Sequence, residues 1–259
     1  MAKATKLDVL AVAAHPDDIE ITCGGLMIKM ARMGRKTGAL DLTRGEMGTH
    51  GSKSDREAEA AEAGRIMQLA WRGNLDLPDS AVEYVQVNKL KLAQVIRDTR
   101  PELVILPHWK QRHPDHLACS QLGYDACFLS GLKKADLQGD PYRPRKIIYA
   151  SYMRNLEYSF LVNITDEFSQ KIEAVAAYKS QFGERDNIKE ALTAGAEFVG
   201  LERNSDVHNI FHPGVNIYDL MHIRNRQMGQ LVDCKYAEAY TVKEQIRIDD
   251  PMLMPVQSI

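Results

Sequence analysis

Two nearly continuous apolar runs constrain the fold more than any other feature of this sequence. Leu7–Ala14 reads LDVLAVAA and Glu102–Leu106 reads ELVIL. Such runs are typical of parallel strands that are buried on both faces of a sheet. After the first run we expect a turn at His15–Thr22, a helix at Gly24–Met33 and a second strand at Lys36–Leu42. This alternation predicts an α/β fold with a Rossmann-like open, mostly parallel sheet and helices on both faces.

The alternation becomes less regular after Gly139. We expect a single domain over residues 1–259, in which residues 1–139 form the Rossmann-like core and residues 140–259 form a C-terminal elaboration. Within the second part the patterns favour strands at Arg145–Ala150, Phe160–Ile164 and Ala239–Lys243, and helices at Asp166–Ser180, Asn187–Ala196 and Tyr218–Asp233.

Charge and composition exclude several classes of protein. The chain has 33 basic and 35 acidic residues, so no basic surplus indicates a nucleic-acid or membrane-surface partner. No run approaches the roughly 18 apolar residues of a membrane span, and the N-terminus lacks the pattern of a signal peptide. The four cysteines are scattered and form no CxxC pair. We therefore expect a cytoplasmic protein with reduced thiols and a small-molecule partner.

Histidines gather where strands are expected to end. Five of the eight histidines precede residue 117, and each lies in a loop that follows a predicted strand: His15, His50, His108, His113 and His116. In open α/β sheets, ligands bind outside the carboxyl ends of the strands. Five histidines at that edge, accompanied by acidic residues, predict a functional site.

The first cluster is His15-Pro16-Asp17-Asp18, directly after the first strand. Proline suits the first turn of a helix, and residues three apart on that turn face one point. His15 and Asp18 are therefore candidate metal ligands. Asp17 is rotated by about 100° from its neighbour, so it would stand beside the metal rather than on it. The alternative is a plain helix start in which Asp17 or Asp18 acts only as a cap.

The second cluster, His113-Pro114-Asp115-His116, repeats this arrangement after the ELVIL strand. His116 is the candidate third ligand. We expect His113 to lie behind the ligands, with Asp115 fixing its tautomer and orientation, as carboxylates do for catalytic histidines. The alternative is that His113 and Asp115 merely cap the helix. Two such clusters at the ends of two strands favour a site.

Three nitrogen and oxygen ligands leave one coordination position open, which is the pattern of a catalytic rather than a structural zinc ion. Asp17 is then the natural base to take a proton from water, and His113 could stabilise the oxyanion or protonate the departing amine. The charge of His113 stays open. Two histidines and one aspartate also form the facial triad of ferrous oxygenases, and a non-catalytic metal- or sugar-binding module is a third reading. An acid beside the metal suits water activation better than oxygen chemistry.

A polar loop, Thr43–Gly51, is the third candidate element. Its glycines permit tight turns and close approach of the backbone to a ligand. Arg44 and His50 lie in this loop, and Arg56 lies just beyond it, in a helix that Ser54 or Asp55 is expected to cap. Arg56 could bind a carboxylate or sugar hydroxyls through its planar guanidinium. The alternative is a solvated residue of the first helical turn.

These motifs together resemble one enzyme family. AAHPDD at 13–18, TRGEMGTHG at 43–51 with Arg56-Glu57 beyond it, and HPDH at 113–116 resemble the PIG-L (LmbE-like) family of zinc N-deacetylases. Within it the chain is most similar to the bacillithiol-pathway branch, which removes acetate from N-acetylglucosaminyl malate. The likeness extends more loosely to KYAEAY at 235–240. By position, the resemblance implies zinc ligation by His15, Asp18 and His116, a general base at Asp17, a catalytic histidine at His113 oriented by Asp115, and substrate binding at Arg56.

The resemblance also implies hydrolysis of the N-acetyl amide of an N-acetylglucosamine conjugate, one Zn²⁺ per chain (with Fe²⁺ or another divalent ion as the alternative) and a homo-oligomer. Two positions depart from the family pattern: His50 stands where close relatives often have arginine, and Ala237 stands where they often have glycine. The remaining histidines show no ligand spacing, and we expect them at the surface or at a subunit interface: His208, His212 and His222.

Overall fold

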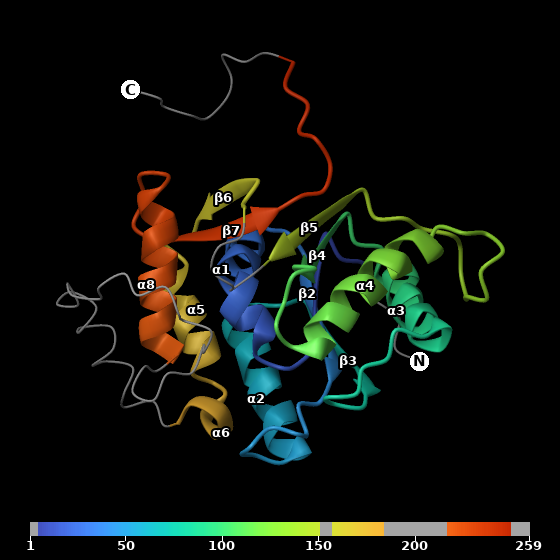
Figure 1. Cartoon of the computed structure of the whole chain (residues 1–259), viewed down its shortest axis with the longest axis horizontal. Coiled ribbons are helices and arrows are strands. Elements are labelled where there is room, and N and C mark those ends of the chain that lie inside the picture. Colours follow the sequence, from blue (N-terminus) through green and yellow to red (C-terminus); the bar gives the residue numbers. More distant parts are fainter. Residues whose placement is uncertain (1–4, 151–156, 184–216, 250–259) are drawn as a thin grey trace.

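The computed structural model describes residues 5–150, 157–183 and 217–249 (Figure 1). Within these residues seven strands form one sheet with the order β3-β2-β1-β4-β5-β7-β6. They are β1 (Val9–Ala13), β2 (Thr37–Thr43), β3 (Trp71–Leu77), β4 (Leu103–Pro107), β5 (Lys146–Ala150), β6 (Phe160–Asn163) and β7 (Ala237–Thr241). Neighbouring strands from β3 to β5 are parallel, whereas β7 is antiparallel to both β5 and β6. The predicted mostly parallel sheet is confirmed, with an antiparallel extension at one edge.

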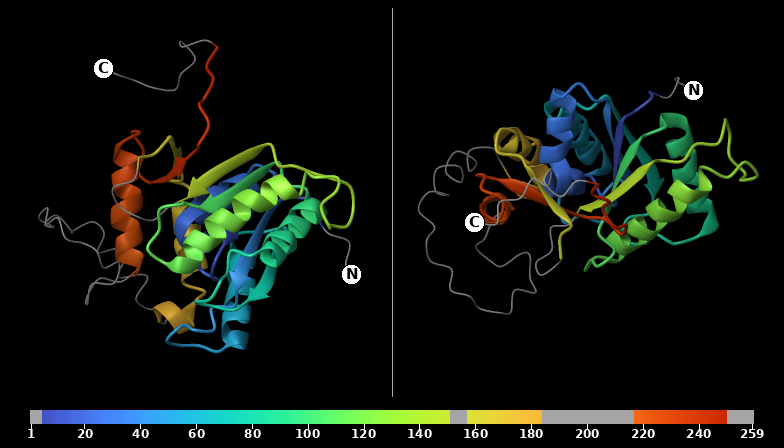
Figure 2. Two further views of the ribbon diagram at one scale, coloured as in Figure 1. Left: turned by 45° about the vertical axis from the view of Figure 1, so that its right-hand side comes forward. Right: turned by 90° about the horizontal axis from the view of Figure 1, so that it is seen from above.

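Helices cover both faces of this sheet. They are α1 (Asp18–Arg32), α2 (Lys53–Ile66), α3 (Gln86–Thr99), α4 (Pro114–Leu129), α5 (Phe168–Val175), α6 (Lys179–Phe182) and α8 (Ile217–Gln230). Figure 2 shows α3 and α4 on one face and α1, α2 and α5 on the other. Leu10 and Val12 of β1 belong to the core with α3 and α4, whereas Val9 and Ala11 pack in the core with α1. Because successive strand residues point to opposite faces, the wholly apolar β1 serves both cores.

The direction in which the sheet grows reverses beside β1. The chain proceeds from β1 outward to β2 and β3, then returns to place β4 on the other side of β1. In the β1–β4 pair, Val9 lies opposite Leu103 and Ala11 lies opposite Ile105. The segments that follow these two strands therefore emerge side by side at the carboxyl edge, where open α/β sheets bind their ligands.

Helix α1 begins earlier than the sequence pattern indicates. We expected a turn over His15–Thr22 and a helix from Gly24, but α1 starts at Asp18. Gly24, the expected first residue, and Gly25 both lie inside the helix, where Gly25 allows close packing. A Cβ atom on Gly25 would lie 2.8 Å from Cδ1 of Ile164 and 2.9 Å from Oε1 of Glu238. Glycine is needed there because β7 and the segment after β6 press against the helix.

Other boundaries differ less. The cap of α2 is Ser52, which forms a capping box with Asp55, two residues before the expected Ser54. The helix expected at Asp166–Ser180 is divided into α5 and the short α6. The helix expected at Asn187–Ala196 lies outside the described residues. Among the helices that the structure describes, none has the length and apolar character needed to cross a bilayer.

A buried ion pair ties the late elements to α1. Nζ of Lys171, on α5, lies 2.6 Å from Oε1 of Glu238, on β7, and both side chains are almost wholly inaccessible to solvent. Glu238 also accepts hydrogen bonds from the backbone N–H groups of Gly25 and Leu26 and from the hydroxyl of Tyr240. This carboxylate therefore joins α1, α5 and the antiparallel edge of the sheet.

Candidate functional site

The two His-Pro turns meet at the carboxyl edge between β1 and β4. Nδ1 of His15 lies 3.3 Å from Oδ2 of Asp18, and Nε2 of His116 lies 3.2 Å from the same oxygen. The two ring nitrogens lie 3.3 Å apart. The three side chains that the sequence predicts as metal ligands thus bring one donor atom each to a single point.

This triangle has the dimensions of a metal site. Ligands roughly 2.0–2.1 Å from a tetrahedral zinc ion lie about 3.3–3.4 Å from one another, and the three separations here are 3.2 to 3.3 Å. Two imidazoles and one carboxylate are also ligands that borderline divalent ions accept. The residues present therefore fit a divalent metal ion.

A second possible ligand group shares one histidine with the first. His15, His113 and Asp115 also bring potential ligand atoms together. However, Nδ1 of His113 accepts a hydrogen bond from the backbone N–H of Asp115, and the Asp115 carboxylate accepts from the backbone N–H groups of Ser80 and Val82. Because these bonds already engage its members, the group of His15, Asp18 and His116 is the better candidate.

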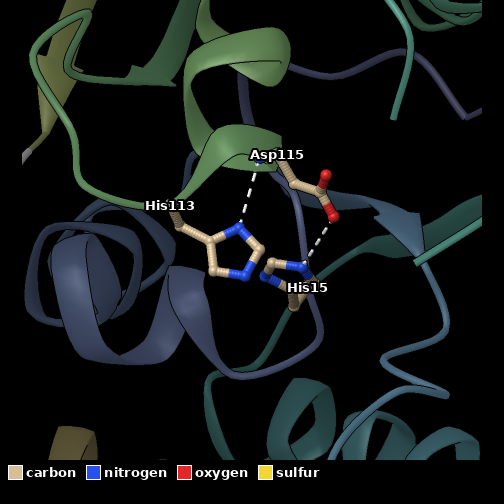
Figure 3. A group of neighbouring side chains, drawn as sticks. All are labelled: His15, His113 and Asp115. Carbon is tan, nitrogen blue, oxygen red and sulfur yellow. Dashed lines mark hydrogen bonds and ion pairs between the residues drawn. The ribbon is translucent and has the colours of Figure 1, made fainter. Parts of the chain in front are cut away.

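Figure 3 shows that the Asp115 carboxylate points to His15 rather than to His113. Its Oδ2 lies 3.2 Å from Nε2 of His15, and only the backbone N–H of Asp115 reaches His113, at 3.2 Å. The expectation that Asp115 orients His113 through its side chain is therefore corrected. The physical reason is that bonds from Ser80 and Val82 hold the carboxylate at the Nε2 edge of His15. A carboxylate on the outer nitrogen of a ligating histidine fixes its tautomer.

Sequence reasoning missed a second carboxylate at the same place. Oδ1 of Asp79 lies 3.1 Å from Nε2 of His15, and its other oxygen accepts the backbone N–H of Met47. Asp79 follows β3 by two residues, so it stands at the same carboxyl edge as the histidines. An acidic residue just after a strand was the available signal, but Trp71–Leu77 reads WRGNLDL, a pattern too polar to indicate a strand strongly.

These carboxylates set the electrostatics of the site. Burial alone would lower the pKa of His15, but hydrogen bonds to Asp115, Asp18 and Asp79 raise it to about 12. Burial would raise the pKa of Asp18, but His116 and His15 hold it well below its usual range. The pKa of Asp79 falls to about 2, because the bonds from His15 and Met47 outweigh its burial. The site therefore attracts positive charge, whether as protons on the imidazoles or as a metal cation.

Asp17 stands beside the three candidate ligands but is held differently. Its Oδ2 accepts a hydrogen bond from Nη2 of Arg56 at 3.0 Å. It occupies the N-cap position of α1 without making a side-chain capping bond. Burial raises the pKa of Asp17 to about 7, against the lowering effect of Arg56. A carboxylate with a pKa near 7 can both accept and return a proton near neutral pH.

His113 is held in one tautomer by its hydrogen bond. It is the N-cap of α4, and its Nδ1 accepts the backbone N–H of Asp115. A ring nitrogen that accepts a bond carries no proton, so the neutral ring has its proton on Nε2. Burial, followed by the charges of His15 and His116, lowers the pKa of His113. His113 is therefore oriented to donate a hydrogen bond from Nε2.

A cavity of about 500 Å³ opens onto the site. This volume is within the range of small-molecule sites. Polar residues at its wall are Asp17, Asp18, Thr22, His113, His116, Thr49, His50, Gln111, Arg112 and Gln181, and apolar residues include Ile19, Ile21, Phe182 and Ile217. The cavity is therefore a candidate substrate pocket whose wall combines the polar cluster with apolar side chains.

The three residues predicted to bind substrate lie in different places. His50 lines the cavity. Arg44 points outward, where it pairs with Asp76 and Glu57. Arg56 is buried behind Asp17 and does not line the cavity.

Of the three late histidines, only His222 lies in the described part of the chain. His208 and His212 lie outside the described residues. His222 is buried rather than at the surface, because it packs beside Phe168 and bonds the hydroxyl of Tyr236 through Nδ1.

Comparison with known proteins adds independent information. A family model described as "PIG-L: GlcNAc-PI de-N-acetylase" matches residues 10–127, a range that includes every candidate ligand. A diacetylchitobiose deacetylase from Thermococcus kodakarensis is 30% identical over 189 residues, which cover 68% of this chain and 70% of that protein.

Solved structures share the fold over most of its length. The conserved protein TT1542 from Thermus thermophilus has a TM-score of 0.78 and 36% identity, covering 93% of this chain and 97% of that one. GalB, the 4-carboxy-2-hydroxymuconate hydratase from Pseudomonas putida KT2440, has a TM-score of 0.70 with 16% identity over 93% of this chain and 98% of that one. The second likeness shows the fold alone, since one fold hosts more than one reaction.

Proposed function

Because the chain belongs to the PIG-L family of de-N-acetylases, we propose that it hydrolyses the N-acetyl amide of an N-acetylglucosamine conjugate with the help of a divalent metal ion. The observation that carries the proposal is the convergence of donor atoms from His15, Asp18 and His116 at a cavity that Asp17 also lines. Family membership selects deacetylation among the reactions that such a site could perform.

The metal assigned here is zinc, one ion per chain, held by His15, Asp18 and His116. A mixed set of three nitrogen and oxygen ligands is typical of catalytic zinc, although Fe²⁺ or another divalent ion fits the same donors. When bound, such an ion acts as a Lewis acid that lowers the pKa of water and polarises an amide carbonyl.

Asp17 and His113 perform the proton transfers and charge stabilisation in this proposal. Asp17 accepts the proton of the attacking water, and its raised pKa suits this task near neutral pH. His113, with its proton on Nε2, donates a hydrogen bond to the carbonyl oxygen as that oxygen gains negative charge. Asp17 then returns its proton to the departing nitrogen, so that water and amide become acetate and amine.

The conjugate assigned as substrate is N-acetylglucosaminyl malate of bacillithiol biosynthesis. This assignment rests on the similarity of the AAHPDD, TRGEMGTHG and HPDH motifs to that branch of the family. The main competitor is a chitobiose-type sugar, because a relative of this chain is named a diacetylchitobiose deacetylase. His50 lines the cavity at a position where the malate branch often has arginine. Selectivity for an acidic aglycone is therefore the part of the proposal that the assay below tests most specifically.

An acetate-release assay tests the activity and the substrate together. The metal-loaded protein is incubated with N-acetylglucosaminyl malate, diacetylchitobiose and N-acetylglucosamine, each at several concentrations. We expect release from all conjugates that the cavity admits, with the highest kcat/KM for the malate conjugate. A higher kcat/KM for diacetylchitobiose would contradict the malate conjugate as the assigned substrate. No acetate release from any N-acetyl sugar would contradict the deacetylase assignment.

The same proposal includes a cytoplasmic homo-oligomer in which residues 1–259 form one domain. The homo-oligomer is supported by the resemblance of the motifs to the family, the location by the scattered cysteines, and the single domain by the pattern of strands and helices. Light scattering coupled to size exclusion gives the mass of the assembly, and a monomer at micromolar concentration would contradict this part.

A further inference from the structure

Arg56 is close to the candidate site but separated from its cavity. It stands in the first turn of α2, and its side chain is only 4% exposed. Its Nη2 donates to the carbonyl oxygen of Pro16 and, at 3.0 Å, to Oδ2 of Asp17. Asp17 lines the cavity, whereas Arg56 does not. A substrate in the cavity therefore meets the carboxylate and not the guanidinium behind it.

The backbone that Arg56 holds is strained. Asp17 has a φ of 107° and a ψ of −30°, a conformation that a residue with a side chain rarely adopts. Such positions raise the free energy of the folded state and persist only where surrounding contacts enforce them. Arg56 bonds both the carbonyl that precedes Asp17 and the carboxylate of Asp17 itself. It therefore holds both the backbone before Asp17 and the Asp17 side chain.

The glycine loop provides the space for this guanidinium. Gly45 has a φ of +68°, and a Cβ atom there would lie 2.9 Å from both Nε and Nη2 of Arg56. On another side, the ring of Tyr178 lies 5.4 Å from Cζ of Arg56. Nε and Nη1 have no hydrogen-bond partner in the described part of the chain. The directed bonds of Arg56 therefore concentrate on Pro16 and Asp17.

From this geometry we infer that Arg56 is a positioning residue for the general base: it holds the Asp17 carboxylate in its working orientation, and Gly45 keeps the space that Arg56 occupies. The inference rests on the proposed function for its kinetic consequence. It assigns Arg56 a role different from the substrate contact that the family resemblance implies. A positioning residue acts on the rate of the chemical step, whereas a substrate contact acts mainly on KM.

Arg56→Lys is the first test, because lysine keeps the charge but cannot bond both acceptors in the same way. We expect kcat to fall at least about tenfold, which corresponds to about 1.4 kcal/mol of lost transition-state stabilisation. KM should stay within about twofold of the parent value, and the metal content should not change. A rise in KM with an unaltered kcat would overturn the inference in favour of a substrate contact.

A double-mutant cycle separates action through Asp17 from a general effect. Because Arg56 works only through the base, the pair Arg56→Lys and Asp17→Asn should be no slower than Asp17→Asn alone. If instead the double variant lost kcat by the product of the two single-variant factors, the inference would be contradicted. Gly45→Ala should reproduce the loss in kcat. Gly34→Ala serves as its control, because Gly34 has a similar φ of +81° but no atoms within 4 Å of the added Cβ.

A crystal structure of the Arg56→Lys variant gives a readout that does not depend on activity. We expect Asp17 to leave its strained conformation or its carboxylate to turn, with the fold and the other site residues unchanged. An unaltered Asp17 would overturn the inference even if the protein is a deacetylase. Conversely, a displaced Asp17 in a protein that releases no acetate would leave the positioning role standing and contradict the proposed function.

Discussion

The buried ion pair between Lys171 and Glu238 allows a quantitative prediction about stability. Each carboxylate oxygen of Glu238 accepts two hydrogen bonds, one oxygen from Gly25 and Lys171 and the other from Leu26 and Tyr240. In Glu238→Gln the amide NH₂ group must face two of these donors. The less damaging orientation places it toward Tyr240, whose hydroxyl can turn to accept, but it still opposes the N–H of Leu26.

The magnitude follows from what this variant leaves behind. The ammonium of Lys171 is wholly buried, and breaking a buried pair by removing one charge costs about 3–5 kcal/mol. For a protein of this size that loss lowers Tm by about 6–20 °C. Lys171→Met should cost less, because Glu238 then keeps three donors. The double variant should be more stable than the sum of the single losses implies.

Thermal and urea unfolding measure both losses. Glu244→Gln is the matched control, because the same chemical change occurs at an exposed position on the same segment; we expect it to stay within about 0.5 kcal/mol of the parent. If Glu238→Gln were no more destabilising than this control, the carboxylate could not be the link between α1, α5 and β7.

Three further predictions concern the site. Asp17→Asn should keep its metal and lose at least about 100-fold in kcat, the usual contribution of a general base; full activity with metal bound would refute that role. His116→Ala should lose metal in elemental analysis, and an unchanged metal content would exclude it as a ligand. Metal binding at neutral pH should release protons, because the pKa of His15 in the metal-free protein is raised to about 12. Protons then compete with the cation, so affinity should rise with pH. Calorimetry in buffers of different ionisation enthalpy counts the protons, and a count of zero would contradict the pairing of His15 with its carboxylates.

The sequence predicts the parts of this molecule that follow from local pattern. The apolar run at Leu7–Ala14 predicts β1 because a strand buried on both faces must be apolar throughout. The two His-Pro clusters predict the candidate ligands because parallel strands bring their carboxyl ends to one edge. Local pattern is sufficient in both cases, since each signal lies within a few residues.

Features that depend on distant partners were predicted less well. The packing role of Gly25 depends on Ile164 and Glu238, which lie far along the chain, so the sequence pattern placed the start of the helix at the neighbouring Gly24. The partner of Asp115 depends on bonds from the loop after β3, and proximity in sequence favoured His113 instead. Arg56 was expected at the substrate for a similar reason, because no local pattern shows that it is buried behind Asp17.

Anomalous diffraction from crystals of the zinc-loaded protein tests the central claim most directly. We expect one strong peak within bonding distance of Nδ1 of His15, Oδ2 of Asp18 and Nε2 of His116, with Asp17 beside it but not coordinated. A peak held instead by Nε2 of His15 together with His113 and Asp115, or no ordered ion between the two His-Pro turns, would contradict the account.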